Sequence, residues 1–434
     1  MNLFNNYAIN FYRQRILKSN FLKNIVTLTT GSFFSQLILL GFSPVLTRLY
    51  EPSDFANFYL FNTLSTTMLP AIALRYNIAL VVVKEKKESD KLFKLSIWVA
   101  IFISALTFII IILFKNFFID ILNAESIRGW LIFFPVVTFF SGLNLIFIDY
   151  SNRNKQYKFI SFILIIKSLF GTLIAFIIPF LHIGIELNGL IISLFMTPIF
   201  SVFLFLLKYK KFSRNLNINF NLIFLAKKYR KFPLFSALPS FLNNLTASLP
   251  ILFLTKYYPL AIVGYYSLSN RVAIAPLGFI SKSISQVHLR KVSELIHSDK
   301  NPIDYILKLT IILIFVMSIP FLLFTFFGRE IIPIIFGNEW EMSGVFISIL
   351  MPAISIKFIV STLSPVFSST GNNKISALWQ IFSFISTFFV LYIFSGNLST
   401  KNILIAITIT DVILYCLYYF LILYSVRNPK NISY

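Results

Sequence analysis

Long apolar segments separated by short polar loops recur along the whole chain. A stretch of about 20 apolar residues is long enough to cross the hydrocarbon core of a bilayer as an α-helix. The pattern predicts twelve such spans, at residues 22–47, 55–83, 92–114, 128–150, 158–180, 186–207, 232–256, 262–288, 305–327, 342–368, 375–395 and 402–425. Proline and glycine interrupt several of them, which a helical bundle tolerates because neighbouring helices satisfy the freed backbone groups. We therefore expect an all-α polytopic membrane protein.

The composition agrees with this interpretation. Of the 434 residues, 57% are hydrophobic and only 12% are charged, whereas about a quarter of the residues in a soluble domain carry charge. No polar stretch is long enough for a separate soluble domain. The single cysteine, Cys416, lies in an apolar segment, which excludes a disulfide framework and a cysteine metal site.

The formal net charge of +22 would suit a nucleic-acid partner, but its distribution argues against one. The Lys and Arg residues are concentrated in alternate short loops between the spans, and membrane proteins keep such basic loops in the cytoplasm. This distribution predicts that both termini lie in the cytoplasm. Residues 1–21 are then a cytoplasmic amphipathic segment, residues 208–231 a basic cytoplasmic linker and residues 426–434 a cytoplasmic tail.

The parts of the chain on either side of the linker resemble each other. A displacement of 208 residues aligns polar positions of the two parts: Leu46-Thr47-Arg48 with Leu254-Thr255-Lys256, Tyr50 with Tyr258, and Asn62 with Asn270. Both copies begin on the cytoplasmic side, so the repeat is parallel. We expect an N-terminal six-helix bundle at 22–207 and a C-terminal six-helix bundle at 232–425, related by pseudo-two-fold symmetry. Duplicated bundles of this kind are typical of transporters that rock one half against the other.

Five cations fall inside the predicted spans: Arg75, Lys167, Arg271, Lys282 and Lys357. Each such charge costs about 2.5–3.5 kcal/mol to insert, and Asp411 is the one acid at comparable depth. We expect the excess positive charge to line a water-filled cavity and to bind an anionic substrate. Arg suits phosphate or carboxylate through its planar fork, and Lys serves as a point charge. For Lys282, snorkelling to the cytoplasmic interface is the alternative.

Polar residues in the spans add further candidates. Asn62 and Asn270 are expected to contact the hydroxyl groups of a sugar, with hydrogen bonding between helices as the alternative. Asp411 is a candidate carrier of a coupling ion, H⁺ or Na⁺, or else a salt-bridge partner for one of the cations. The sequence has no metal-ligand spacing, no nucleotide-binding loop and no catalytic constellation. We therefore expect a transporter without a cofactor rather than an enzyme.

Several short motifs give the chain a family resemblance. They are Ser43-Pro44-Val45-Leu46-Thr47-Arg48-Leu49-Tyr50, Arg75-Tyr76, Arg271-Val272 with Pro276, and Ile356-Lys357-Phe358-Ile359. Their order and spacing resemble those of the polysaccharide-repeat-unit (O-antigen) flippases of the multidrug/oligosaccharidyl-lipid/polysaccharide exporter superfamily. Asn77 stands where that family usually has Glu, so a role for the acid does not carry over.

The resemblance implies a V of two six-helix bundles around a central cationic cavity. It implies that the chain moves an undecaprenyl-diphosphate-linked oligosaccharide from the inner to the outer leaflet of the bacterial inner membrane. The implied partners are this glycan, the lipid bilayer and other polysaccharide assembly proteins. A drug or cation exporter of the same superfamily is the alternative, although it would need acids in the cavity. A membrane-bound polysaccharide polymerase or ligase is a further alternative, against which the short outer loops argue.

Overall fold

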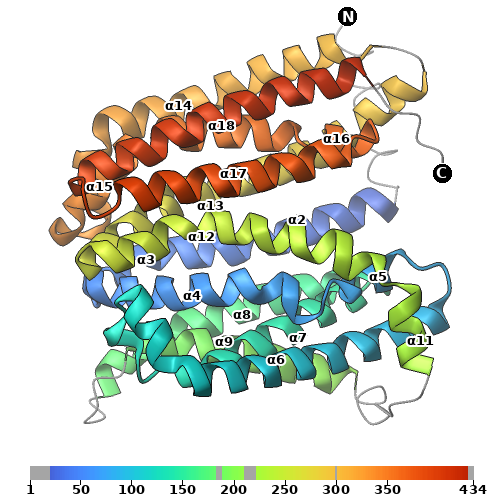
Figure 1. Cartoon of the computed structure of the whole chain (residues 1–434), viewed down its shortest axis with the longest axis horizontal. Coiled ribbons are helices and arrows are strands. Elements are labelled where there is room, and N and C mark those ends of the chain that lie inside the picture. The colour runs from blue at the N-terminus through green and yellow to red at the C-terminus, as the bar shows by residue number, and fades with distance from the viewer. Residues whose placement is uncertain (1–19, 182–187, 210–220, 299–300, 429–434) are drawn as a thin grey trace, which may run out of the picture.

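In the computed structural model, which describes residues 20–181, 188–209, 221–298 and 301–428, long helices run side by side along the longest axis (Figure 1). The N-terminal half consists of α2 (Asn20–Gly41), α3 (Ser43–Leu46), α4 (Pro52–Ile72), α5 (Tyr76–Val82), α6 (Lys86–Leu122), α7 (Phe134–Arg153), α8 (Tyr157–Ile177) and α9 (Gly189–Lys208). The short helix α11 (Asn221–Lys228) follows. The C-terminal half consists of α12 (Leu238–Tyr257), α13 (Leu260–His297), α14 (Ile303–Phe336), α15 (Glu341–Leu363), α16 (Val366–Ser369), α17 (Asn373–Phe394) and α18 (Thr400–Arg427).

The fold class predicted from the sequence, an all-helical polytopic membrane protein, is confirmed. Among the described residues, 10 helices are long and apolar enough to cross a membrane, or 11 if α4 and α5 form one span bent by 54°. The remaining long helix, α13, is not among them because Asn270, Arg271 and Lys282 interrupt its apolar sequence. It is nevertheless continuous over 38 residues and passes through Pro276 without ending. The predicted segment at 1–21 lies almost entirely outside the described residues.

The packing within one half is repeated in the other. In the N-terminal half, α2 packs on α8, α7 packs on α6 and α9, α8 packs on α9, and α4 packs on α7. In the C-terminal half, α12 packs on α17, α15 packs on α14 and α18, α17 packs on α18, and α13 packs on α15. These five pairs of neighbouring helices recur at the same places in both halves, as expected of a duplicated bundle.

Two tyrosines of the sequence repeat make matching hydrogen bonds. The Tyr50 hydroxyl donates to the carbonyl of Ala175, at the end of α8, over 2.7 Å. The Tyr258 hydroxyl donates to the carbonyl of Leu398, just beyond α17, over 2.9 Å. Both bonds tie the turn after the first helix of a half to the end of its fifth long helix. The Tyr thus occurs in both halves for a structural reason.

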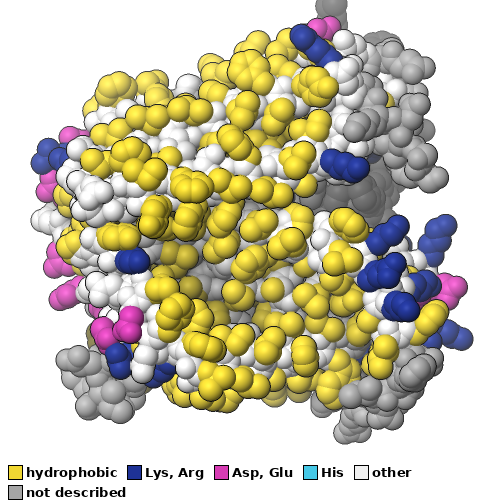
Figure 2. All heavy atoms as spheres, viewed as in Figure 1, with side chains coloured by type: hydrophobic (Ala, Val, Ile, Leu, Met, Phe, Trp, Pro, Cys, Tyr) yellow, Lys and Arg dark blue, Asp and Glu magenta, His cyan; other side chains and the backbone are white. Residues whose placement is uncertain are grey.

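The bundle has two chemically different ends. We call the end at which α2 begins and α18 ends the basic end, because Lys and Arg side chains gather there in Figure 2. The opposite end, the far end, carries exposed acids such as Glu51, Glu125 and Glu339. On the face that Figure 2 shows, apolar side chains cover most of the surface between the two ends. Leu113 and Phe315 are among the exposed apolar residues of the long helices. Such a continuous apolar belt matches the hydrocarbon of a bilayer and would be unfavourable in water.

The halves are joined at the far end. The indole Nε1–H of Trp340, at the start of α15, donates to the Thr47 carbonyl over 3.0 Å. The Trp340 ring also meets Phe55 of α4 edge-on, with 4.9 Å between centroids. Gly264 of α13 lies against the Pro52 carbonyl so closely that a Cβ atom would overlap it. A buried hydrogen bond, an aromatic contact and a backbone approach therefore close this end.

Candidate functional site

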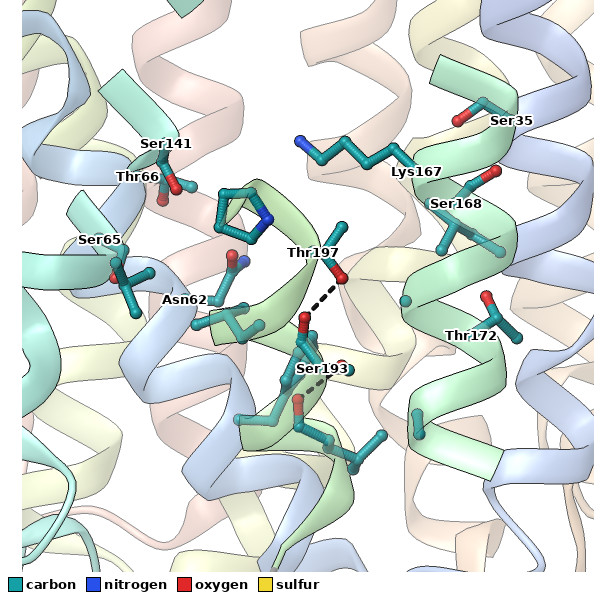
Figure 3. Close-up of a pocket in the computed structure, with 18 of the residues that line it drawn as sticks. Ser35, Asn62, Ser65, Thr66, Ser141, Lys167, Ser168, Thr172, Ser193 and Thr197 are labelled. Atoms are coloured by element: carbon teal, nitrogen blue, oxygen red, sulfur yellow. Dashed lines mark hydrogen bonds between the residues drawn. The ribbon is translucent and has the colours of Figure 1, made fainter. Parts of the chain in front are cut away.

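A cavity of about 390 Å³ lies among α2, α4, α7, α8 and α9 (Figure 3). Its polar lining residues are Ser35, Gln36, Asn62, Ser65, Thr66, Ser141, Lys167, Ser168, Thr172, Ser193, Thr197 and Arg271. No Asp or Glu is among the residues that line it within the described part of the chain. The cavity is therefore a polar space with two cations and no carboxylate to neutralise them.

Lys167 reaches into this cavity from α8, as Figure 3 shows. It lies on one face of that helix with Leu164, Ser168, Gly171 and Thr172, which all line the cavity. Their spacing of three or four residues places them in one stripe. Among the described residues, Lys167 forms no ion pair. Because no carboxylate among the described residues pairs with the Lys167 ammonium group, that group is available to an anionic ligand.

The hydroxyl groups around Lys167 mostly donate to their own helices. Ser193 donates to the Leu190 carbonyl over 2.7 Å and Thr197 to the Ser193 carbonyl over 2.5 Å (Figure 3). Ser65, Thr66 and Ser168 do the same on their helices. Each hydroxyl has one donor and two lone pairs. Because the donors are used, these walls offer mainly acceptor oxygens to a ligand.

Two amides complete the lining. Within the described part of the chain, neither the Asn62 nor the Gln36 side chain has a hydrogen-bond partner, and both line the cavity. An amide can donate and accept, so each is able to bond a sugar hydroxyl in either direction. Asn62 therefore lines the cavity, and its contact with a sugar stays a prediction.

Arg271 brings the second positive charge from the other half. It is the one lining residue of the cavity that comes from the described part of the C-terminal half. Its Nη2 donates to the Leu39 carbonyl of α2 over 2.8 Å, and its Nη1 donates to the Tyr59 hydroxyl of α4 over 3.3 Å. Arg271 thus borders the cavity and joins the two halves.

Lys357 and Asp411 form a separate polar site in the C-terminal half. Lys357 of α15 is paired with Asp411 of α18, and neither residue lines the cavity. Of the two alternatives for Asp411, the structure shows the salt bridge. The pairing also means that Lys357 is not an uncompensated charge in this conformation.

Arg75 lies at the break between α4 and α5 rather than in the cavity. Leu74 and Arg75 both have left-handed backbone conformations, with φ of 45° and 61°. Next to them, the Asn77 amide donates to the Asp149 carboxylate over 2.7 Å. This bond explains Asn at 77, because a Glu there would face a second carboxylate.

Two other predicted residues do not join the cavity. The Asn270 amide donates to the Tyr266 carbonyl of its own helix over 3.1 Å. Lys282 is exposed near the basic end of α13 and is not among the lining residues. The sequence interpretation missed the hydroxyl-lined walls. Ser168 with Thr172 and Ser193 with Thr197 repeat at a spacing of four, and this was the available signal.

Comparisons with known proteins agree with the helical architecture. Residues 45–345 match a family described as "Polysaccharide biosynthesis protein". No curated protein sequence matches the chain. The lipid II flippase MurJ in an inward closed conformation superposes with a TM-score of 0.74 at 16% identity, covering 93% of this chain and 87% of MurJ.

Two further structures are similar over most of their length. A transporter of the MOP superfamily from Pyrococcus furiosus gives a TM-score of 0.64 at 13% identity, covering 93% of this chain and 96% of its own. The MATE transporter VcmN of Vibrio cholerae gives 0.61 at 12% identity, covering 94% and 97%. At these identities the likeness establishes the shared fold.

Proposed function

Because the chain belongs to the polysaccharide biosynthesis protein family, we propose that it is a flippase for lipid-linked oligosaccharides. In this proposal it moves an undecaprenyl-diphosphate-linked repeat unit, of the O-antigen or capsule type, from the inner to the outer leaflet of the bacterial inner membrane. It works by alternating access between the two halves. The fold it shares with MurJ and the MATE transporters supports a transport function.

The observation that carries the proposal is the chemistry of the cavity. Lys167 and Arg271 supply two positive charges, and no acid lines the space among the described residues. A guanidinium binds phosphate oxygens through paired N–H donors, and an ammonium adds charge. The hydroxyl oxygens around them accept hydrogen bonds from a ligand. A ligand that satisfies both features is an anion that carries O–H or N–H donors, such as a glycosyl diphosphate.

The remaining predicted residues receive subsidiary roles. Asn62 contacts the first sugar, whereas Asn270 must give up its bond to Tyr266 before it can reach a glycan. Arg75 and Lys282 lie toward the basic end, where they add to the positive field that an incoming anion meets. Asp411 carries a coupling H⁺ or Na⁺ in conformations in which its bond to Lys357 is open.

The orientation follows from the charge distribution. Basic loops stay in the cytoplasm, so the basic end faces the cytoplasm and the far end faces outward. The bond between Trp340 and Thr47 then closes the outer side. We infer that this conformation is closed to the outside, as expected before substrate is moved.

A drug or cation exporter is the competing proposal, and the cavity argues against it. An exporter of cations requires carboxylates at the site, but the lining among the described residues is cationic and neutral. The proposal is tested by deleting the gene and analysing surface glycan and lipid-linked precursors. Loss of surface glycan with precursor retained in the inner leaflet supports the flippase. Normal glycan with altered drug tolerance refutes it.

A further inference from the structure

We infer that Arg271 is a latch between the two halves, which an anionic head group opens, and that Tyr59 is the residue that positions it. The inference rests on the proposed function, since it names how the same cavity couples binding to movement. Arg271 belongs to α13, whereas both of its hydrogen-bond acceptors belong to the N-terminal half. Its guanidinium therefore ties the halves together from inside the cavity.

A row of contacting side chains connects the Arg271 latch with the closed far end. The Tyr59 ring meets Phe55 with 6.2 Å between centroids, and Phe55 meets Trp340 at 4.9 Å. Trp340 in turn donates to the Thr47 carbonyl. A row of three aromatic side chains thus leads from Arg271 to the hydrogen bond that closes the outer side. Movement at Tyr59 cannot leave this row undisturbed, because close-packed rings transmit displacement.

A diphosphate competes directly with the acceptors of the latch. A guanidinium has five N–H donors, of which two are used, by Leu39 and Tyr59. Both acceptors are neutral, and hydrogen bonds to ionised acceptors are about twice as strong as neutral ones. An anion in the cavity also feels the charge of Lys167. The anion therefore draws the guanidinium away from α2 and α4.

In the parent protein these bonds are lost, and the far-end closure is weakened, only when substrate is present. A ligand shifts a conformational equilibrium by its differential affinity for the two states. Here the closed state must share Arg271 between the anion and the N-terminal half, whereas the open state gives Arg271 to the anion alone. An anionic head group accordingly favours opening to the outside. After release, Arg271 returns to Leu39 and Tyr59 and the far end closes again.

The test measures the opening of the far end and the binding of diphosphate in the same full-length protein. Cys416 is first replaced by Ser, and spin labels are attached at Gly129→Cys and Asn397→Cys, two exposed far-end positions in different halves. The protein is reconstituted in lipid nanodiscs, and inorganic diphosphate and farnesyl diphosphate serve as probes. Tyr59→Phe removes one acceptor of the latch and keeps the ring. Tyr392→Phe, at an exposed position on α17, is the matched control.

In the labelled protein with Tyr59 intact, we expect diphosphate to lengthen the distance between the two spin labels. In Tyr59→Phe we expect a larger open population without ligand and about five-fold tighter diphosphate binding, because one neutral hydrogen bond no longer competes. Tyr392→Phe should behave as the parent. Diphosphate binding without any change of distance, or a Tyr59→Phe variant identical to the control, overturns the latch. Absence of diphosphate binding by the parent instead refutes the proposed function.

Discussion

Lys357 on α15 and Asp411 on α18 form an ion pair, with 2.5 Å between the ammonium nitrogen and a carboxylate oxygen. The ring of Tyr415 lies 5.6 Å from the same ammonium nitrogen. No such partner faces Lys167 among the described residues of the N-terminal half. The two halves thus share a packing pattern but differ in charge: Lys357 of the C-terminal half is neutralised by Asp411, whereas Lys167 of the N-terminal half has no carboxylate partner among the described residues.

Breaking this pair on one side should destabilise the protein. Asp411→Asn leaves Lys357 without a carboxylate, and removing one member of a fully buried pair costs about 3–5 kcal/mol. The Lys357 side chain is 36% exposed, so we expect a smaller loss, of about 1–3 kcal/mol. Thermal unfolding in detergent measures it. An Asp411→Asn variant as stable as the parent contradicts a structural role for the pair.

Removing both charges separates structure from ion coupling. In Lys357→Met with Asp411→Leu, no charge remains unpaired, and apolar replacements of buried pairs are often neutral or stabilising. We expect this double variant to regain the stability of the parent. If Asp411 also carries a coupling ion, the double variant should unfold normally and still fail to transport. Full transport by the double variant rules out that coupling role.

The hydrogen bond of Trp340 to Thr47 should hold the far end closed. Trp340→Phe keeps an aromatic ring and removes the donor, which costs the closed state about 1 kcal/mol. We expect a longer distance between the far-end spin labels at Gly129→Cys and Asn397→Cys. Trp379→Phe is the matched control, since the Trp379 indole donates to Leu414 within the C-terminal half. Equal label distances in the two variants would argue against the closure.

Gly264 is predicted to permit the closed far end. A Cβ atom there would overlap the Pro52 carbonyl of the other half, whereas nothing lies within 4 Å of a Cβ atom at Gly278 on the same helix. Gly264→Ala should therefore keep the halves apart at the far end and abolish transport. Gly278→Ala should transport normally. The distance between far-end spin labels distinguishes them, and a normal closed distance in Gly264→Ala refutes the prediction.

The pairing of Asn77 with Asp149 predicts a charge-dependent stability change. Asn77→Glu replaces an amide donor by a carboxylate next to Asp149, and we expect a loss of about 1–3 kcal/mol from the lost bond and the repulsion. Adding Asp149→Asn to this variant should restore stability, because the amide introduced at position 149 can then donate to the introduced carboxylate. Thermal unfolding of the single and double variants tests this. Additive losses would show that the two positions do not interact.

The helices could be predicted from the sequence because their cause is local. Long apolar runs form helices in a bilayer, where each backbone group must be satisfied within its own segment. The repeat could be seen in the sequence because Tyr50 and Tyr258 form matching hydrogen bonds, one in each half. Charges in apolar spans likewise predicted Lys167 and Arg271 as cavity-lining residues. Both line the cavity, and their contact with a substrate stays a prediction.

The partners of these residues could not be predicted, since they depend on distances between remote segments. Arg271 donates to a backbone carbonyl 232 residues away. Every residue has such a carbonyl, so the sequence does not indicate which one accepts the bond. The break in the second span also lies away from its proline. Pro70 lies inside α4, and the chain breaks only at Leu74 and Arg75, where the backbone is left-handed. Local propensity does not indicate such a position, because strain is held there by the surrounding structure.

The central claim is tested by flipping in proteoliposomes. Lipid-linked glycans extracted from the deletion strain are incorporated in vesicles with the purified protein, and their exposure to membrane-impermeant periodate is followed. We predict that the parent and Lys401→Ala, which removes an exposed cation at the far-end start of α18, expose glycan from the opposite leaflet. Lys167→Ala with Arg271→Ala should abolish exposure while remaining folded. A double variant that moves the glycan at the rate of the parent would contradict the account, because the cationic cavity would then not be the substrate site.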